Sequence, residues 1–194
     1  MRRALGVIAL ACAALVIPHA AAAQTGQRYA VLVEGASGDQ AHADLQRKSL
    51  TALEQKFRDE YKLDAQHLFV LASQPQAGEL RATSDDVKKV FARVVPEMKP
   101  LDVLFVLLLG HGSFDGTDAK FNLVGPDLTE KEWAALVKPA AGRVIFVNTT
   151  PASSPFLKAL AGPNHITITA TDQTAQRYDT VFADAFVQAL SAPS

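Results

Sequence analysis

His111 is the residue of this sequence best suited to acid–base chemistry. It lies between Gly110 and Gly112, directly after the apolar run 102–109. Such a run, bounded by turn residues and too short to span a bilayer, predicts a strand buried on both faces of a parallel sheet. In these sheets, ligands bind beyond the carboxyl ends of the strands. The position predicts ligand contact or catalysis; a histidine bonded only to a backbone carbonyl is the alternative.

A second polar group of candidates follows the apolar strand predicted at 143–148. Its loop contains the hydroxyl-bearing residues Thr149, Thr150, Ser153 and Ser154. If the two strands are neighbours, this loop faces His111, as in acyl-transfer enzymes where a histidine activates a nucleophile. Gly112 could then offer its N–H to an oxyanion. The alternative is a polar strand-to-helix turn with Ser153 as the N-cap.

The missing thiol limits this chemistry. The only cysteine, Cys12, lies in the N-terminal segment, so the rest of the chain has no thiolate nucleophile, thiolate metal ligand or disulfide. A threonine hydroxyl is a far weaker acid than a thiol and needs a base in direct hydrogen-bond contact. Thr150 also precedes Pro151, which favours an extended backbone. Hydrolysis by Thr150, Ser153 or Ser154 with His111 is therefore the second hypothesis, and binding is the first.

The N-terminal segment has the layout of a secretory signal peptide. A basic start at Arg2 and Arg3 precedes the apolar stretch 4–17 and the small residues 20–23. This pattern predicts cleavage near Ala23 and a periplasmic or secreted protein without membrane association after cleavage. An uncleaved anchor and lipid attachment at Cys12 are the alternatives.

Charge and composition limit the possible partners. Removing 1–23 takes away two arginines and leaves 17 basic and 20 acidic residues, a formal net charge of −3. Nucleic-acid binding, which needs a clustered basic surface, is not expected. With 48% hydrophobic and 20% charged residues, the chain suits a globular domain, which we expect over 24–194.

Strand and helix patterns alternate along this domain. Strands are predicted at 28–35, 67–71, 102–109, 143–148 and 165–170, and helices at 44–61, 83–95, 129–137, 153–161 and 179–190. A polar loop is expected at 73–81 and a hairpin within 113–125. The alternation predicts an α/β fold, a three-layer αβα sandwich around a mostly parallel sheet with flavodoxin-like strand order.

Several segments resemble one known family. They are Tyr29–Gly38, His111-Gly112-Ser113, the strand 143–148 and the tail segments 168–172 and 178–182. Over about 28–190 the chain resembles the legumain/caspase-like cysteine peptidases, most nearly the legumain family. The resemblance implies a caspase-like fold with His111 at the position of the catalytic histidine.

The chain departs from that family where the chemistry occurs. The cysteine position falls on Thr150 or within one residue of it, and Ala41 stands where an arginine would precede His42. The resemblance therefore implies an inactive peptidase that binds a peptide, a protein or a small ligand in the remnant cleft. The candidate binding residues are Glu34, His42, Ser113, Asn148, Ser153 and Ser154.

The remaining motifs predict little chemistry. Nucleotide binding is a weaker third hypothesis, since Gly35-Ala-Ser-Gly38 lacks the spacing of a phosphate-binding loop. Asp115 and Asp118 are expected mainly to form a turn, and a cation site there is the weaker alternative. The histidines show no metal-ligand spacing, so on spacing alone we expect His42, His67 and His165 to be structural, although the resemblance makes His42 a binding candidate, and we predict neither metal nor cofactor. The sequon at Asn148 falls on a buried strand end, so we expect no glycosylation there.

Overall fold

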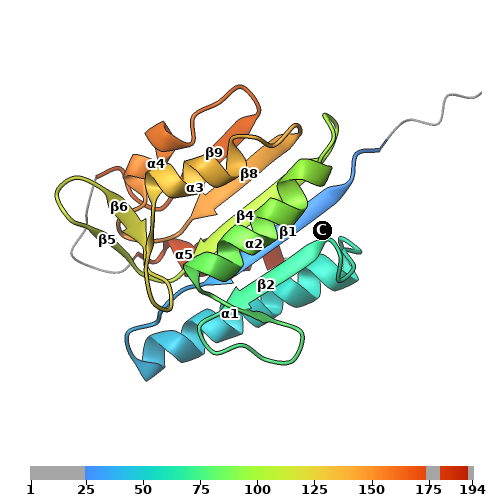
Figure 1. Cartoon of the computed structure of the whole chain (residues 1–194). Helices are drawn as coiled ribbons and strands as arrows, with labels where there is room; N and C mark the ends of the chain where they lie inside the picture. The colour runs from blue at the N-terminus through green and yellow to red at the C-terminus, as the bar shows by residue number, and fades with distance from the viewer. Residues whose placement is uncertain (1–24, 174–179, 192–194) are drawn as a thin grey trace, which may run out of the picture.

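A six-stranded parallel sheet forms the centre of the molecule (Figure 1). The computed structural model describes residues 25–173 and 180–191. The strand order is β3-β2-β1-β4-β8-β9, and every neighbouring pair is parallel. The strands are β1 (Arg28–Glu34), β2 (Leu68–Ala72), β3 (Leu80–Arg81), β4 (Val103–Leu109), β8 (Arg143–Asn148) and β9 (His165–Thr169).

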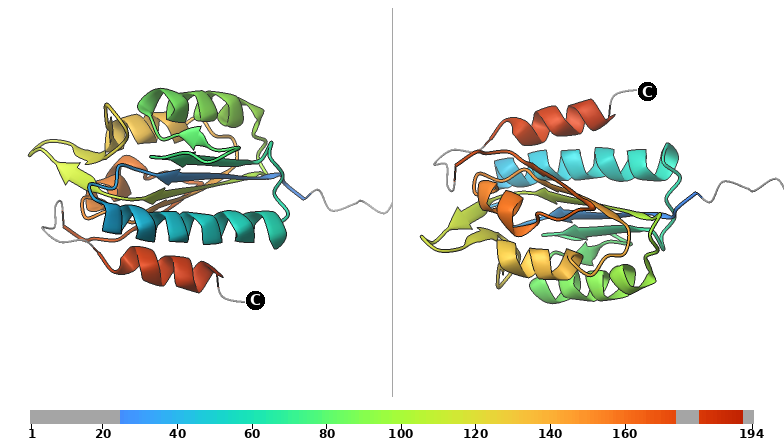
Figure 2. Two further views of the ribbon diagram at one scale, coloured as in Figure 1. Left: turned by 90° about the horizontal axis from the view of Figure 1, so that it is seen from below. Right: turned by 90° about the horizontal axis from the view of Figure 1, so that it is seen from above.

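Helices cover both faces of this sheet (Figure 2). Helices α1 (Gln40–Asp59) and α5 (Phe182–Ser191) lie on one face. On the other lie α2 (Ser84–Val94), α3 (Glu130–Val137) and the short α4 (Ser154–Ala159). Without the two-residue edge strand β3, the strands follow the flavodoxin-like order. The predicted three-layer αβα fold with a parallel sheet is confirmed.

The two faces of the sheet have separate cores because successive side chains of a strand point to opposite faces. Trp133 of α3 is fully buried at the centre of one core, edge-on to the rings of Phe91, Phe121 and Phe146. On the other face, the α1 residues Leu50, Leu53 and Phe57 pack with α5. The second core holds α5 against α1.

The helix starts follow their capping residues. The capping box at Thr129 and Glu132 is confirmed, and Thr83 caps α2 by accepting the N–H of Asp86. The predicted start of α1 at residue 44 was wrong: the helix begins at Gln40 because the Asp39 carboxylate accepts the N–H of His42. Ser153 is the N-cap residue of α4, as expected, but its side chain makes no capping hydrogen bond.

A small antiparallel sheet extends from the main sheet directly after His111 (Figure 1). It consists of β5 (Gly112–Phe114), β6 (Ala119–Phe121) and β7 (Leu128–Thr129). The predicted hairpin is confirmed, although its second strand is 119–121 rather than 121–125. A short 3-10 helix, η1 (Val95–Glu97), continues α2 and contains Pro96.

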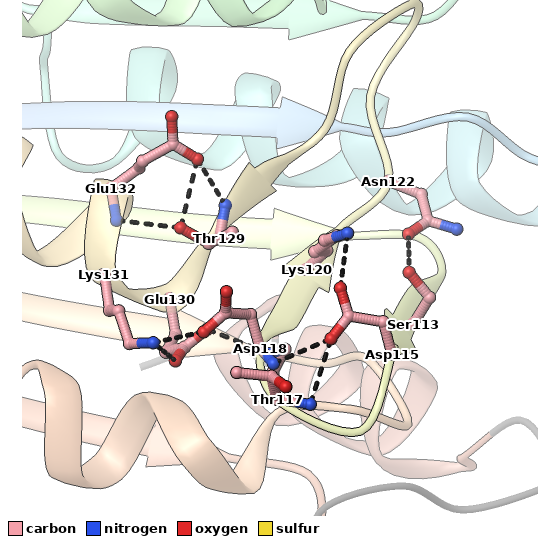
Figure 3. Close-up of polar contacts among 11 residues, drawn as sticks. Ser113, Asp115, Thr117, Asp118, Lys120, Asn122, Thr129, Glu130, Lys131 and Glu132 are labelled. Atoms are coloured by element: carbon pink, nitrogen blue, oxygen red, sulfur yellow. Dashed lines mark hydrogen bonds and ion pairs between the residues drawn. The ribbon is translucent and has the colours of Figure 1, made fainter.

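The hairpin turn is held by charges (Figure 3). The Asp115 carboxylate accepts the N–H groups of Asp118 and Thr117 and pairs with Lys120 at 2.7 Å, while Asp118 pairs with Lys131. The Asp118 N–H, Lys120 and the Thr117 N–H hold the pKa of Asp115 well below its usual range. Both carboxylates thus already have partners, and the described residues contain no group of three side chains that could hold a metal.

Within 25–173 and 180–191, no helix is both long enough and apolar enough to cross a bilayer. The predicted signal peptide, 1–23, lies outside the described residues.

Candidate functional site

Three loops meet at the carboxyl edge of the sheet. They follow β1, β4 and β8, the three central strands of the sheet order. The Gly35 N–H donates to the Leu109 carbonyl at 2.9 Å, and the Thr149 N–H donates to the Leu108 carbonyl at 3.1 Å. The expected convergence is therefore present, and His111 lies at its centre.

The His111 ring is oriented by a backbone carbonyl. Its Nε2 lies 2.8 Å from the carbonyl oxygen of Ser37, so Nε2–H donates and Nδ1 is the acceptor nitrogen of the neutral ring. The loop that presents this carbonyl turns at Gly38, whose φ of 78° is disfavoured for other residues. A histidine fixed in one tautomer is the arrangement a general base requires, and it also matches the purely structural alternative.

His42 lies against this ring. The two imidazoles meet edge to face with centroids 5.0 Å apart. The Nδ1 of His42 is 2.9 Å from both carboxylate oxygens of Asp39. Hydrogen bonds from the backbone N–H and then the ring of His42 lower the pKa of Asp39. The first turn of α1 thus brings a carboxylate and a second imidazole to the histidine after β4.

Thr150, the residue at the predicted nucleophile position, is sealed inside the protein. It is fully buried, and its Oγ1 has no hydrogen-bond partner among residues 25–173 and 180–191. The backbone of Gly112 packs on it so closely that a Cβ at Gly112 would lie 2.5 Å from Oγ1. Its N–H donates to the Asn148 side chain at 3.0 Å. Thr150 and His111 therefore form no hydrogen-bonded dyad.

The hydroxyls of Thr149 and Ser153 have structural partners. Thr149 donates to the Leu108 carbonyl at 2.8 Å. Ser153 is fully buried, and its Oγ accepts the N–H groups of Ala170 at 3.0 Å and Thr171 at 3.2 Å. These bonds join the loops after β8 and β9. Ser154 is half-buried, and its N–H donates to the Thr171 hydroxyl at 3.2 Å.

Three further candidates do not line the cavity beside His111. Glu34 is 2% exposed and pairs with Arg47 at 3.0 Å; burial raises its pKa more than Ser73 and Arg47 lower it. Asn148 is fully buried, consistent with no glycan there. Ser113 is exposed on the hairpin and donates to Asn122 at 3.1 Å (Figure 3).

The cavity beside His111 has a volume of about 220 Å³ and lies between α1, the start of α5 and the loops after β4 and β8. His42, Leu45, Gln46 and Ser49 line it from α1 at helical spacing. The other lining residues are Leu109, Gly110, His111, Thr149, Pro151, Thr180, Val181, Ala183 and Asp184.

Of the predicted site residues, the cavity thus brings together His111 and His42, with Thr149 from the candidate loop. Sequence reasoning missed Gln46, Ser49 and Asp184. The spacing of His42, Gln46 and Ser49 along one helix face was a usable signal, but only with α1 starting at residue 40. The contribution of α5 depends on packing that no local pattern shows.

Comparisons with known proteins assign no function to this site. No protein-family model matches the chain, and no curated protein matches it. Among solved structures, it is similar to protein GSU0716 from Geobacter sulfurreducens, with 17% sequence identity and a TM-score of 0.44. The match covers 64% of this chain and 50% of that protein, so the chain spans about half the length of the structure it matches.

Proposed function

We propose that this chain is a legumain/caspase-like domain without peptidase activity, which binds a peptide or protein segment in the cavity beside His111. The observation that carries the proposal is the buried Thr150 hydroxyl, which has no hydrogen-bond partner. A threonine nucleophile must pass its proton to a base in direct contact. Thr150 has no such base, and the Ser153 hydroxyl is held by two backbone N–H groups.

The surroundings of His111 favour binding. An imidazole fixed in the wall of a cavity can contact a ligand without taking part in catalysis. The cavity, at about 220 Å³, is below the roughly 300–1,000 Å³ of pockets that enclose a whole drug-sized ligand. It suits one side chain of a longer segment. Leu45 and Val181, 55% and 84% exposed, offer apolar surface to the rest of such a segment.

We place this function in the periplasm or outside the cell, on the basis of the signal-like segment 1–23. Cell fractionation and N-terminal sequencing of the recovered protein test this, with Gln24 expected as the first residue. Recovery of an intact Met1 on a cytoplasmic protein would overturn the localisation and leave the binding proposal standing.

The test of the function is a turnover assay on the processed protein. Fluorogenic peptides with Asn, Asp or Arg before the reporter should not be cleaved. Uncleavable peptides of the same sequences should bind, measured by fluorescence anisotropy, and Leu45→Ser, which removes apolar surface without adding charge, should weaken the binding several-fold. Cleavage that disappears in His111→Ala would overturn the proposal.

The same protein distinguishes the other hypotheses. Labelling by a serine-reactive phosphonate, lost in Ser154→Ala or Thr150→Val, would favour the hydrolase. A thermal shift with nucleotides and none with peptides would favour nucleotide binding.

A further inference from the structure

Among the described residues that line the cavity beside His111, the only side chain with a full charge at neutral pH is a carboxylate. No lysine or arginine of the described residues lines it. Asp184 contributes a carboxylate from α5, and Gln46 contributes an amide oxygen from α1. A ligand group that fits these two must carry hydrogen-bond donors, and the carboxylate favours one that is also positively charged.

Gln46 has an unmet hydrogen-bonding group. Its Oε1 is buried and has no hydrogen-bond partner. A buried acceptor left without a partner costs about 1–3 kcal/mol, so most such groups in proteins are bonded. Because Gln46 lines the cavity, a turn of its amide toward the cavity would let a donor supplied by a ligand remove this cost. Because Gln46 lies one helical turn beyond His42 on α1, that donor would sit beside the imidazoles at the carboxyl edge of the sheet.

Asp184 is held at the cavity by the start of α5. The Thr180 hydroxyl donates to the Thr149 carbonyl at 2.9 Å, which ties the residues before α5 to the loop after β8. Asp184 lies in the first turn of this helix and is exposed, and it forms no ion pair with the part of the chain that the structure describes. Its charge is therefore available to a ligand.

The apolar lining suits the stem of a long cationic side chain. Leu45 and Val181 are exposed at the cavity, and Pro151 is buried in its wall. Lysine and arginine place their methylene groups along apolar surface while the charged end reaches polar partners. A carboxylate ligand would instead meet Asp184 with like charge.

We propose that the segment bound in this cavity presents a lysine or arginine side chain, with its charged end at Asp184 and Gln46 and its stem along Leu45 and Val181. The inference rests on the proposed function because it concerns the same cavity, and it adds the chemical class of the ligand. It requires no bond to form or break.

The experiment measures binding of fluorescent peptides of the form Ala-Ala-X-Ala-Ala, capped at both ends, to the processed protein. X is arginine, lysine, citrulline or aspartate, and citrulline matches arginine in shape without its charge. Exposed ion pairs contribute roughly 0.2–1 kcal/mol, which converts to at most about fivefold in affinity. We expect the arginine peptide to bind about threefold to fivefold more tightly than the citrulline peptide, and the gap to narrow at high salt.

Substitutions at the cavity test where the charged end of the ligand lies. In Asp184→Asn, the ratio of arginine to citrulline affinity should fall to about one; in Gln46→Glu, it should rise. Asp59→Asn is the matched control, because Asp59 is exposed at the far end of α1, roughly 25 Å from His42 at 1.5 Å per residue. That control should leave the ratio unchanged.

Equal binding of the arginine and citrulline peptides, tighter binding of the aspartate peptide, or no binding of any of the four would overturn the inference. An unchanged ratio in Asp184→Asn, with native circular dichroism, would also overturn it. Preferential binding followed by cleavage would overturn the proposed function and leave the inference standing. Binding without preference and without cleavage would overturn the inference and leave the proposed function standing.

Discussion

The Thr150 hydroxyl is a polar group in an apolar position. A buried hydroxyl without a partner costs about 1–3 kcal/mol, and valine has nearly the shape of threonine. We therefore expect Thr150→Val to raise the free energy of unfolding by about 1 kcal/mol, measured by urea denaturation. Thr149→Val is the matched control: it removes a hydroxyl that donates to Leu108, so it should lower stability by about 1 kcal/mol. Destabilisation by Thr150→Val would show that the hydroxyl has a partner.

Gly112 is required by its close approach to Thr150. A Cβ at residue 112 would lie 2.5 Å from Thr150 Oγ1 and 3.0 Å from the Lys120 carbonyl, which is too close for either atom. We expect Gly112→Ala to lower the free energy of unfolding by about 1–3 kcal/mol, the usual cost of overpacking.

A double-mutant cycle tests whether this cost arises at Thr150. Thr150→Ala removes the nearest atom, so the combined variant should lose less stability than the two single variants added together. Additive losses, measured by the same denaturation, would place the clash at the Thr150 Cβ, which alanine retains, or at the Lys120 carbonyl.

At the scale of elements, Ser153 joins two strands at their carboxyl ends. Its hydroxyl oxygen accepts N–H groups from Ala170 and Thr171, beyond β9, while its own backbone follows β8. We expect Ser153→Ala to lower the free energy of unfolding by about 1–2 kcal/mol, because the buried Thr171 N–H loses its acceptor, whereas the Ala170 N–H keeps the Asn148 carbonyl at 3.1 Å. Ser154→Ala, whose hydroxyl makes no hydrogen bond with the described residues, should change stability by less than about 0.5 kcal/mol. Equal effects of the two variants would contradict this role.

The central strands were predictable because strands buried on both faces are almost continuously apolar. Val103–Leu109 illustrates this: the run ends at Gly110, and the strand ends with it. The start of α1 was missed because its N-cap is Asp39, whereas the predicted start at residue 44 was based on the apolar residues at helical spacing that follow it. That four-residue error hid the helix face on which His42, Gln46 and Ser49 line the cavity.

The candidate site was predictable only in part. The position of His111 followed from the strand end, since ligands bind at that edge of a parallel sheet. The burial of Thr150 could not be predicted, because it depends on the backbone of Gly112, distant in sequence, packing on its side chain. The position of Asp184 at the cavity could not be predicted either, because it is set by α5 packing on α1 in the second core. Tertiary contacts of this kind leave no local periodicity.

At the scale of the whole molecule, one arginine joins three segments near the site. Arg47 of α1 pairs with Glu34 at the end of β1 at 3.0 Å and with Glu79, just before β3, at 2.7 Å. It also donates to the Gln74 carbonyl at 2.9 Å. The side chains of Glu34 and Glu79 are only 2% and 5% exposed, so this arginine compensates two buried carboxylates.

Glu34 should make the stability of the folded chain depend on pH. Burial raises its pKa above the ordinary 4.5, so the folded protein binds this proton more tightly than the unfolded chain. The resulting stabilisation is complete below the ordinary value and is lost as pH rises through the folded-state pKa. Glu34→Gln carries no such proton and retains an acceptor for Arg47. We expect the stability of this variant, relative to the original chain, to increase from about pH 4 to about pH 7 in urea denaturation.

Replacing Arg47 should change the pH dependence of stability in the direction opposite to Glu34→Gln. Without Arg47, burial acts on Glu34 with less compensation, so its folded-state pKa rises further and more stability is lost as the pH increases. Breaking a buried pair from one side costs about 3–5 kcal/mol, so we expect Arg47→Met to lose about 3 kcal/mol near pH 7. Near pH 4, where the Glu34 carboxyl of the folded chain is protonated, Arg47→Met should lose much less stability. Equal losses at both pH values would show that Arg47 acts through its pair with Glu79 or through packing of its stem, and that the charge of Glu34 does not control the stability of this edge of the sheet.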